Sequence, residues 1–352
     1  MTVWVLLVTA IIVIAMIVVV PFVVDAVLVA NDPNSAVIKS EVVVFQATRS
    51  SAAWQYSEVQ RDSYCPMYQR KTSRITLDKR ARKAYLIDPG IFARRNQFEP
   101  MFPVIERDYD IYPIEYGGLR YDRERSAKWI AEFAERLLTE YDEVVYNGIS
   151  HGGQHALYVN LWLKGIGKKF SRVILHDAPY GVSTMKTVPK IIVGLFRFTA
   201  GASTNVVYKP VVKLLTMMLP KRENVTVPSS KNLQMLLGRT DMSADEYFKW
   251  VKQSAKRNLS GHKFSMFYSE TADMIAAGKE VFPQGAFDGV PVVYIRYLEK
   301  NDTVVQPLAS NIYLEGVPGL RVLDIVGTHG GFTENYDDNV ATLQEAIAEQ
   351  FK

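Results

Sequence analysis

Cysteine is nearly absent from this sequence: Cys65 is the only one among 352 residues. A single cysteine excludes a disulfide scaffold, and it excludes sites in which several cysteines hold zinc or an iron–sulfur cluster. A strong excess of charge is also missing, because 41 Lys and Arg against 37 Asp and Glu leave +4, which argues against a nucleic-acid partner. With 48% hydrophobic and 22% charged residues, the chain can bury a large core and is not disordered.

A long apolar run occupies residues 3–30, and it is longer than the ~20 residues that a transmembrane helix needs. A cleaved signal peptide has an apolar region of about 7–15 residues behind a positively charged start. Here the run is longer, and no Lys or Arg precedes it. The run therefore predicts a single-pass membrane anchor over residues 1–30. Cleavage after Ala26 or Ala30 stays open as the alternative.

A short polar stem is predicted at residues 31–40, between the anchor and the folded part. Few flanking charges orient the anchor, since Lys39 lies on its C-terminal side and no Lys or Arg lies on the other. Most N-terminal anchors export the chain that follows them. We therefore expect the folded part to lie outside the cytoplasm.

Beyond residue 40, short apolar runs alternate with segments of helical periodicity. Helical spacing is present at 126–141, 151–163 and 337–351. Strand-like runs lie at 42–48, 74–78, 84–88, 110–116, 143–146, 171–176, 290–296 and 320–326. This alternation predicts an α/β fold with a mostly parallel, doubly wound sheet that helices cover on both faces, built from residues 41–180 and 290–352.

The alternation stops over residues 181–289, where helical patterns dominate, and we predict an inserted helical cap there. Residues 181–263 of this cap carry 14 Lys and Arg against 4 Asp and Glu. Apolar helices with interspersed cations suit contact with anionic lipid heads, so the cap is a candidate membrane contact besides residues 3–30. The alternative is a solvated cap whose apolar side covers the site.

The segment Gly148-Ile149-Ser150-His151-Gly152 fits the pattern G-x-S-x-G. A strand-like run precedes it and a helical pattern follows it, which is the context that a nucleophile turn requires. Glycines on both sides let the backbone pass closely while Ser150 sits at the apex. The alternative is a glycine-rich turn between strand and helix that binds a phosphate or nothing.

A serine nucleophile needs a base and an orienting acid, which follow it in the chain order acid, then histidine. His329 lies in a glycine-rich loop just after a predicted strand and is favoured over His262, which lies in the predicted insertion. Asp302 follows the predicted strand 290–296, at the sheet edge where open α/β sheets place their sites. Asp302 is therefore the preferred acid, with Asp177 second and Glu299 third.

With these motifs, the sequence resembles the α/β-hydrolase family over about residues 42–352, apart from the cap. The resemblance implies a catalytic triad of Ser150, His329 and Asp302. It also implies an oxyanion hole made by two backbone N–H groups, one of them on His151. The second would come from the loop after the third strand, where Pro89 has no N–H, so that Ile91 or Phe92 is the expected donor.

His151 and His155 lie four residues apart on a predicted helix, a spacing that zinc sites of the H-E-x-x-H type also use. The sequence between them lacks the glutamate of that motif. We therefore interpret both as packed or surface histidines, and we expect no metal site and no cofactor.

Two classes of function remain open. One is a membrane-anchored serine hydrolase, esterase or lipase-like, that cleaves a carboxylic ester of a small-molecule or lipid acyl substrate through an acyl-enzyme on Ser150. An amidase or peptidase would use the same triad. The other is a catalytically silent fold that acts as a membrane-tethered binding module. The presence of Ser150, Asp302 and His329 favours the first class.

Overall fold

The computed structural model describes residues 40–50, 53–64, 71–91, 94–118, 121–180, 184, 221–259, 269–270, 273–274, 277, 283, 285–298, 305–306, 310, 313–329 and 331–348. The predicted anchor over residues 1–30 and all of the stem except Ser40 lie outside these ranges. Within them, no helix combines the length and the apolar character that crossing a membrane requires.

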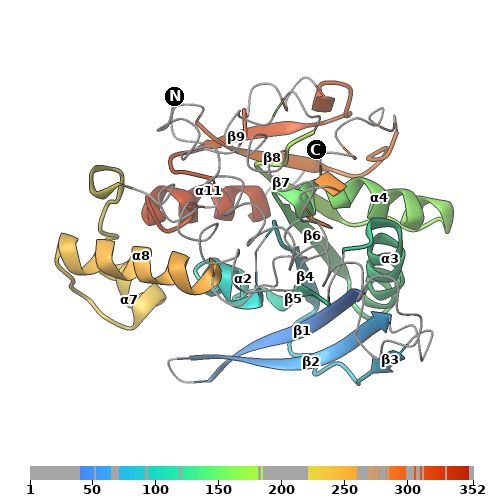
Figure 1. Ribbon diagram of the computed structural model, residues 1–352, viewed down its shortest axis with the longest axis horizontal. Coiled ribbons are helices and arrows are strands. Elements are labelled where there is room, and N and C mark those ends of the chain that lie inside the picture. Colours follow the sequence, from blue (N-terminus) through green and yellow to red (C-terminus); the bar gives the residue numbers. More distant parts are fainter. Residues whose placement is uncertain are drawn as a thin grey trace, which may run out of the picture.

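One nine-stranded sheet forms the centre of the described chain, in the order β3-β2-β1-β5-β4-β6-β7-β8-β9 (Figure 1). Its strands are β1 (Ser40–Ser50), β2 (Ala53–Tyr64), β3 (Lys71–Arg74), β4 (Lys83–Asp88), β5 (Tyr109–Gly118), β6 (Glu143–Ile149), β7 (Arg172–His176), β8 (Val292–Tyr297) and β9 (Arg321–Ile325). The strands β4 to β9 pair in parallel with one another. The strands β1 to β3 pair antiparallel, and β1 joins them to β5. The predicted mostly parallel sheet is confirmed.

The N-terminal strands differ from the predicted ones. β2 was not predicted, because its sequence is largely polar and only four of its 12 residues are buried. The strand expected over residues 74–78 is instead β3, which ends at Arg74. These strands form the antiparallel edge of the sheet, where one face meets solvent and the apolar pattern is weaker.

Helices cover both faces of the sheet, as the apolar strands require. α3 (Arg123–Glu140) and α4 (His151–Gly165) pack on one face, while α2 (Phe102–Ile105) and α11 (Tyr336–Ala348) pack on the other (Figure 1). A short 3-10 helix, η1 (Arg95–Phe98), precedes α2. The apolar side of α3 is buried in the first core through Trp129, Ile130 and Phe133. One apolar core thus lies on each face of the sheet, between the strands and the helices. These cores fix the strand ends from which the loops depart.

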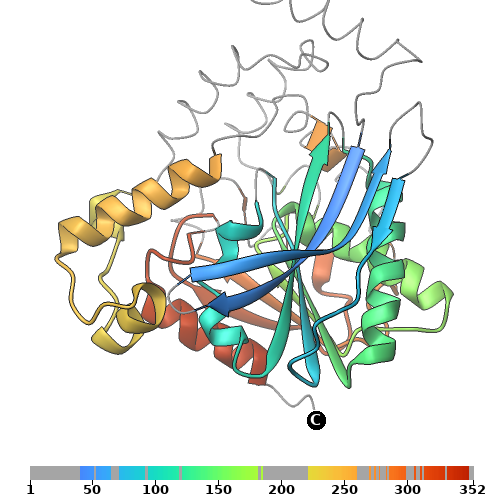
Figure 2. The same cartoon turned by 90° about the horizontal axis from the view of Figure 1, so that it is seen from below.

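The described part of the predicted insertion is helical, and residues 221–259 form a small lobe beside α11 (Figure 2). The lobe contains η4 (Arg222–Asn224), α7 (Ser230–Leu237) and α8 (Ala244–Leu259). Its own small core contains Leu233, Tyr247 and Val251. Polar bonds fix the lobe to the start of α11, since the Ser229 N–H donates to the Asp337 carboxylate at 2.8 Å. A parallel bridge between Thr226 and Asn335 also joins the lobe to the segment between β9 and α11.

Candidate active site

Ser150 lies on the turn between β6 and α4 with a backbone φ of 52° and ψ of −113°. A positive φ is uncommon for a residue other than glycine, and here it places the side chain at the apex of a tight strand–helix turn. The turn is held because the Ser150 N–H donates to the His176 carbonyl at 2.7 Å. A Cβ on Gly152 would overlap the Asp88 carbonyl, so glycine is required for α4 to approach β4.

His329 lies on the loop after β9 and reaches the serine. Its Nε2 is 2.8 Å from the Ser150 Oγ, and its Nδ1 is 2.7 Å from an Asp177 carboxylate oxygen. With the proton on Nδ1, the imidazole donates to Asp177 and accepts from the Ser150 hydroxyl. This tautomer is the one in which the imidazole acts as a base toward the serine.

Asp177 follows β7, the strand next to the one that carries the serine, and its side chain is almost fully buried. Its φ of 51° makes it, with Ser150, one of the two non-glycine residues of positive φ in the described chain. Both turns therefore have unusual backbone at the same sheet edge, which is typical of functional sites.

The structure brings together Ser150, His329 and the second-choice acid, Asp177. The preferred acid, Asp302, lies outside the described residues, as do Glu299 and the alternative base His262. Among the described residues, Asp177 occupies the Nδ1 side of the imidazole, so the geometry favours Asp177 as the orienting acid. Both acids follow strands that end at this edge, and the role of Asp302 stays a prediction.

Burial lowers the pKa of His176 to about 3, so this imidazole is neutral at physiological pH. What His176 supplies to the site is its backbone carbonyl, which receives the Ser150 N–H.

Two features near Ser150 are suited to hold an oxyanion. His151 is the first residue of α4, and the first N–H groups of a helix have no partner within the helix. The loop after β4 passes directly beside the serine, since a Cβ on Gly90 would lie 3.0 Å from the Ser150 Cβ. The predicted donors His151 and Ile91 belong to these two segments, and Phe92 lies outside the described residues. The donor role of each stays a prediction.

The loop after β4 begins at a buried carboxylate. Asp88 accepts hydrogen bonds from the hydroxyls of Tyr116, at 2.6 Å, and of Tyr146, and it lies 2.8 Å from the Nδ1 of His155. A buried charge with several partners fixes the strand end from which the loop departs. His155 faces this cluster while His151 faces Asp273, so the two histidines point to different partners.

A second buried carboxylate braces the histidine loop, and sequence reasoning missed it. Glu334 is 1% exposed and accepts from the Thr328 N–H at 2.9 Å and from the Thr328 hydroxyl. Thr328 directly precedes His329, so Glu334 fixes the backbone that carries the base. Burial raises the pKa of the Glu334 carboxyl to about 6, against the opposing effect of the bonds from Thr328.

Comparison with known proteins gives structural matches only. No family model matches the sequence, and no curated protein matches it. A hydrolase from Pseudomonas aeruginosa superposes with a TM-score of 0.54 at 12% identity, covering 87% of this chain and 98% of its own. An enol-lactonase from Burkholderia xenovorans gives 0.53 at 11% identity, covering 77% and 93%. An esterase from Exiguobacterium antarcticum gives 0.52 at 16% identity, covering 76% and 93%. The chain has the α/β-hydrolase fold.

Replacing the acid tests the assignment of Asp177. We expect Asp177→Asn to lower kcat/KM on an activated ester by about 10³–10⁴-fold, because an amide at this position favours the wrong imidazole tautomer. Asp302→Asn is the matched control and is expected to lose less than about tenfold. The reverse order of losses in steady-state kinetics would return the acid role to Asp302.

The raised pKa of Glu334 predicts a pH-dependent stability. Its folded pKa of about 6 lies above its ordinary value of 4.5, so the unfolded chain ionises more readily. Glu334 therefore lowers the free energy of unfolding by up to about 2 kcal/mol as the pH rises from 4.5 through 6. Urea unfolding at a series of pH values gives the free energy of unfolding against pH. Between pH 4.5 and 6 we expect this free energy to fall more steeply in the native protein than in Glu334→Gln. Glu345→Gln, on an exposed part of α11, controls for the charge change, and an identical slope in all three proteins would contradict the prediction.

Proposed function

We propose that this protein is a serine hydrolase that cleaves a carboxylic ester through an acyl-enzyme on Ser150. The observation that carries the proposal is the continuous chain of contacts from Ser150 Oγ to His329 at 2.8 Å and from His329 to Asp177 at 2.7 Å. A catalytically silent binding module has no need for a nucleophile, a base and an acid within hydrogen-bond distance of one another.

The reaction follows from this geometry. His329 Nε2 takes the Ser150 proton as Oγ attacks the acyl carbonyl, and Asp177 stabilises the imidazolium that forms. Backbone N–H groups at the start of α4 and in the loop after β4 stabilise the oxyanion, each worth about 3–4 kcal/mol. The imidazolium then protonates the leaving alcohol. A water, activated by the same imidazole, cleaves the acyl-enzyme and restores Ser150.

An ester is the substrate class that the comparisons favour. The similar structures include an esterase and an enol-lactonase, and a lactone is a cyclic ester.

Labelling tests the proposal directly. We expect a fluorophosphonate probe to label the folded protein once, on Ser150, and we expect Ser150→Ala to abolish the label while the melting temperature stays near that of the native protein. Turnover of p-nitrophenyl esters of increasing acyl length then identifies the preferred chain, and a matched p-nitroanilide separates ester from amide cleavage. A folded native protein that takes no label would favour a binding module.

The proposal includes a membrane anchor over residues 1–30, with the catalytic domain on the extracytoplasmic side. The apolar run at residues 3–30 supports the anchor, and the excess of Lys and Arg over residues 181–263 supports a further contact with anionic lipid. We expect the full chain to stay with membranes after a carbonate wash and a chain lacking residues 1–30 to be released. Release of the full chain would contradict a retained anchor.

A further inference from the structure

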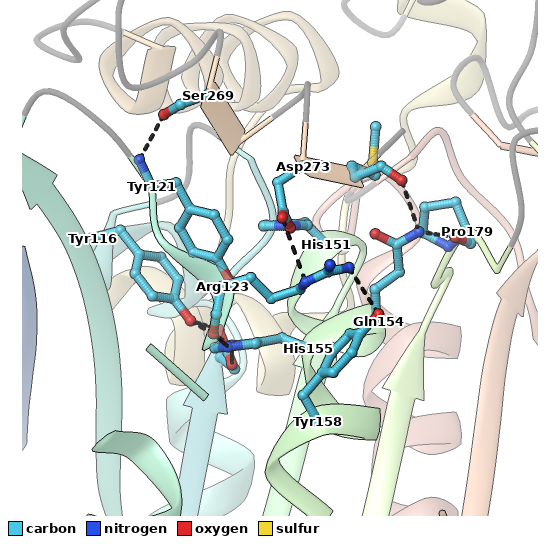
Figure 3. Close-up of polar contacts among 12 residues, drawn as sticks. Tyr116, Tyr121, Arg123, His151, Gln154, His155, Tyr158, Pro179, Ser269 and Asp273 are labelled. Carbon is cyan, nitrogen blue, oxygen red and sulfur yellow. Dashed lines mark hydrogen bonds and ion pairs between the residues drawn. The ribbon is translucent and has the colours of Figure 1, made fainter. Parts of the chain in front are cut away.

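The side chain of His151 points from the start of α4 toward the cap. Its Nε2 lies 3.2 Å from a carboxylate oxygen of Asp273, and the imidazole is almost fully buried (Figure 3). The ring of Tyr121 packs edge-on against it, with ring centroids 4.8 Å apart. The nucleophile mechanism above uses only the backbone N–H of His151, so this imidazole has no assigned role.

Asp273 joins two helix starts of the core. Its other carboxylate oxygen lies 3.5 Å from the Nε of Arg123, the first residue of α3. Arg123 is held in turn, because it donates to the Tyr158 hydroxyl at 2.7 Å and stacks over that ring. Arg123 and His151 therefore each contact one oxygen of the same carboxylate, which joins the imidazole to the start of α3 through an ion pair.

The chain around Asp273 is attached to the core at two further points. The Tyr121 N–H donates to the Ser269 hydroxyl at 2.6 Å, and the Gln154 side chain donates to the Met274 carbonyl at 3.4 Å (Figure 3). Gln154 also donates to the carbonyl of Pro179, two residues after Asp177. The described residues of this cap segment therefore dock where the nucleophile turn and the acid turn meet.

We propose that Asp273 is a positioning residue for the oxyanion hole: it holds the His151 imidazole and thereby fixes the His151 backbone N–H. The inference rests on the proposed function. The peptide between Ser150 and His151 follows a residue at φ 52°, a conformation with little intrinsic preference of its own. An oxyanion donor must be placed within about 0.5 Å to act. Clamping the side chain of the donor residue supplies that placement from the cap.

The expected effect is on the chemical step. Loss of one oxyanion donor costs about 10²–10³ in kcat, and a displaced donor loses part of that. We therefore expect Asp273→Ala and His151→Leu each to lower kcat by about 10–100-fold, with KM changed by less than about threefold.

We call the contact between the His151 imidazole and the Asp273 carboxylate the latch. A double-mutant cycle on kcat for a p-nitrophenyl ester tests whether the two side chains act through this contact or independently. If both side chains act through one contact, the kcat of the double variant His151→Leu/Asp273→Ala is no more than about threefold below that of the slower single variant. Asp273→Asn keeps an acceptor for the imidazole, and its kcat should be at least tenfold higher than that of Asp273→Ala. Asp288→Asn, which removes an exposed ion pair with Lys164 near the opposite end of α4, is the matched control and should keep the native kcat.

Outcomes for the latch and for the proposed function are distinguishable. Native kcat in Asp273→Ala, multiplicative losses in the double variant, or a large rise in KM without loss of kcat would each overturn the latch while fluorophosphonate still labels Ser150. Absence of label on the folded native protein would instead overturn the proposed function and the latch with it. If Asp273→Ala does not fold, two single variants carry the test. His151→Leu is expected to lose kcat as stated above, whereas Asp273→Asn removes the charge that pairs with Arg123 but keeps an acceptor for the imidazole and is expected to retain more kcat than His151→Leu.

Discussion

The hydrogen bond from the Ser150 N–H to the His176 carbonyl is the contact on which the site depends. It continues the parallel pairing of β6 and β7 one step past the last strand pair, Ile149 with His176. This register places Ser150 and Asp177 on adjacent turns at one sheet edge. His329, after β9, needs only to reach back to that edge to touch both. The buried sheet fixes the strand ends, and the strand ends fix the distances within the triad.

Buried carboxylates support the loops that complete this arrangement. Asp88 holds the end of β4 below the loop that passes Ser150, and Glu334 holds the backbone before His329. Each accepts several hydrogen bonds, which offsets part of the cost of burying a charge. On the cap side, Asp273 contacts His151 and Arg123. Three acidic residues outside the proposed triad thus contact the segments that surround it.

The placement of Ser150 and His329 at one sheet edge could be predicted from the sequence because their signals are local. GISHGG follows an apolar strand and precedes a helix, and His329 follows another strand in a glycine-rich loop. The contact of the imidazole with Asp177 could not be predicted, because Asp177 and Asp302 follow different strands that end at the same edge, and the contact is a tertiary one. β2 was missed because an edge strand with one solvated face has little apolar signal. Glu334 and Asp273 were missed because their roles are tertiary contacts.

In the proposed mechanism, the Ser150 oxygen becomes acylated with the help of His329 and Asp177. The most direct measurement is mass spectrometry of the protein quenched in acid during turnover of p-nitrophenyl acetate, followed by peptide mapping. This mechanism predicts one acetyl group on Ser150 in the native protein and a strongly reduced amount in Asp177→Asn at the same quench time. An acetyl group on another residue, or turnover without any adduct in the native protein even at the earliest quench times, would contradict it.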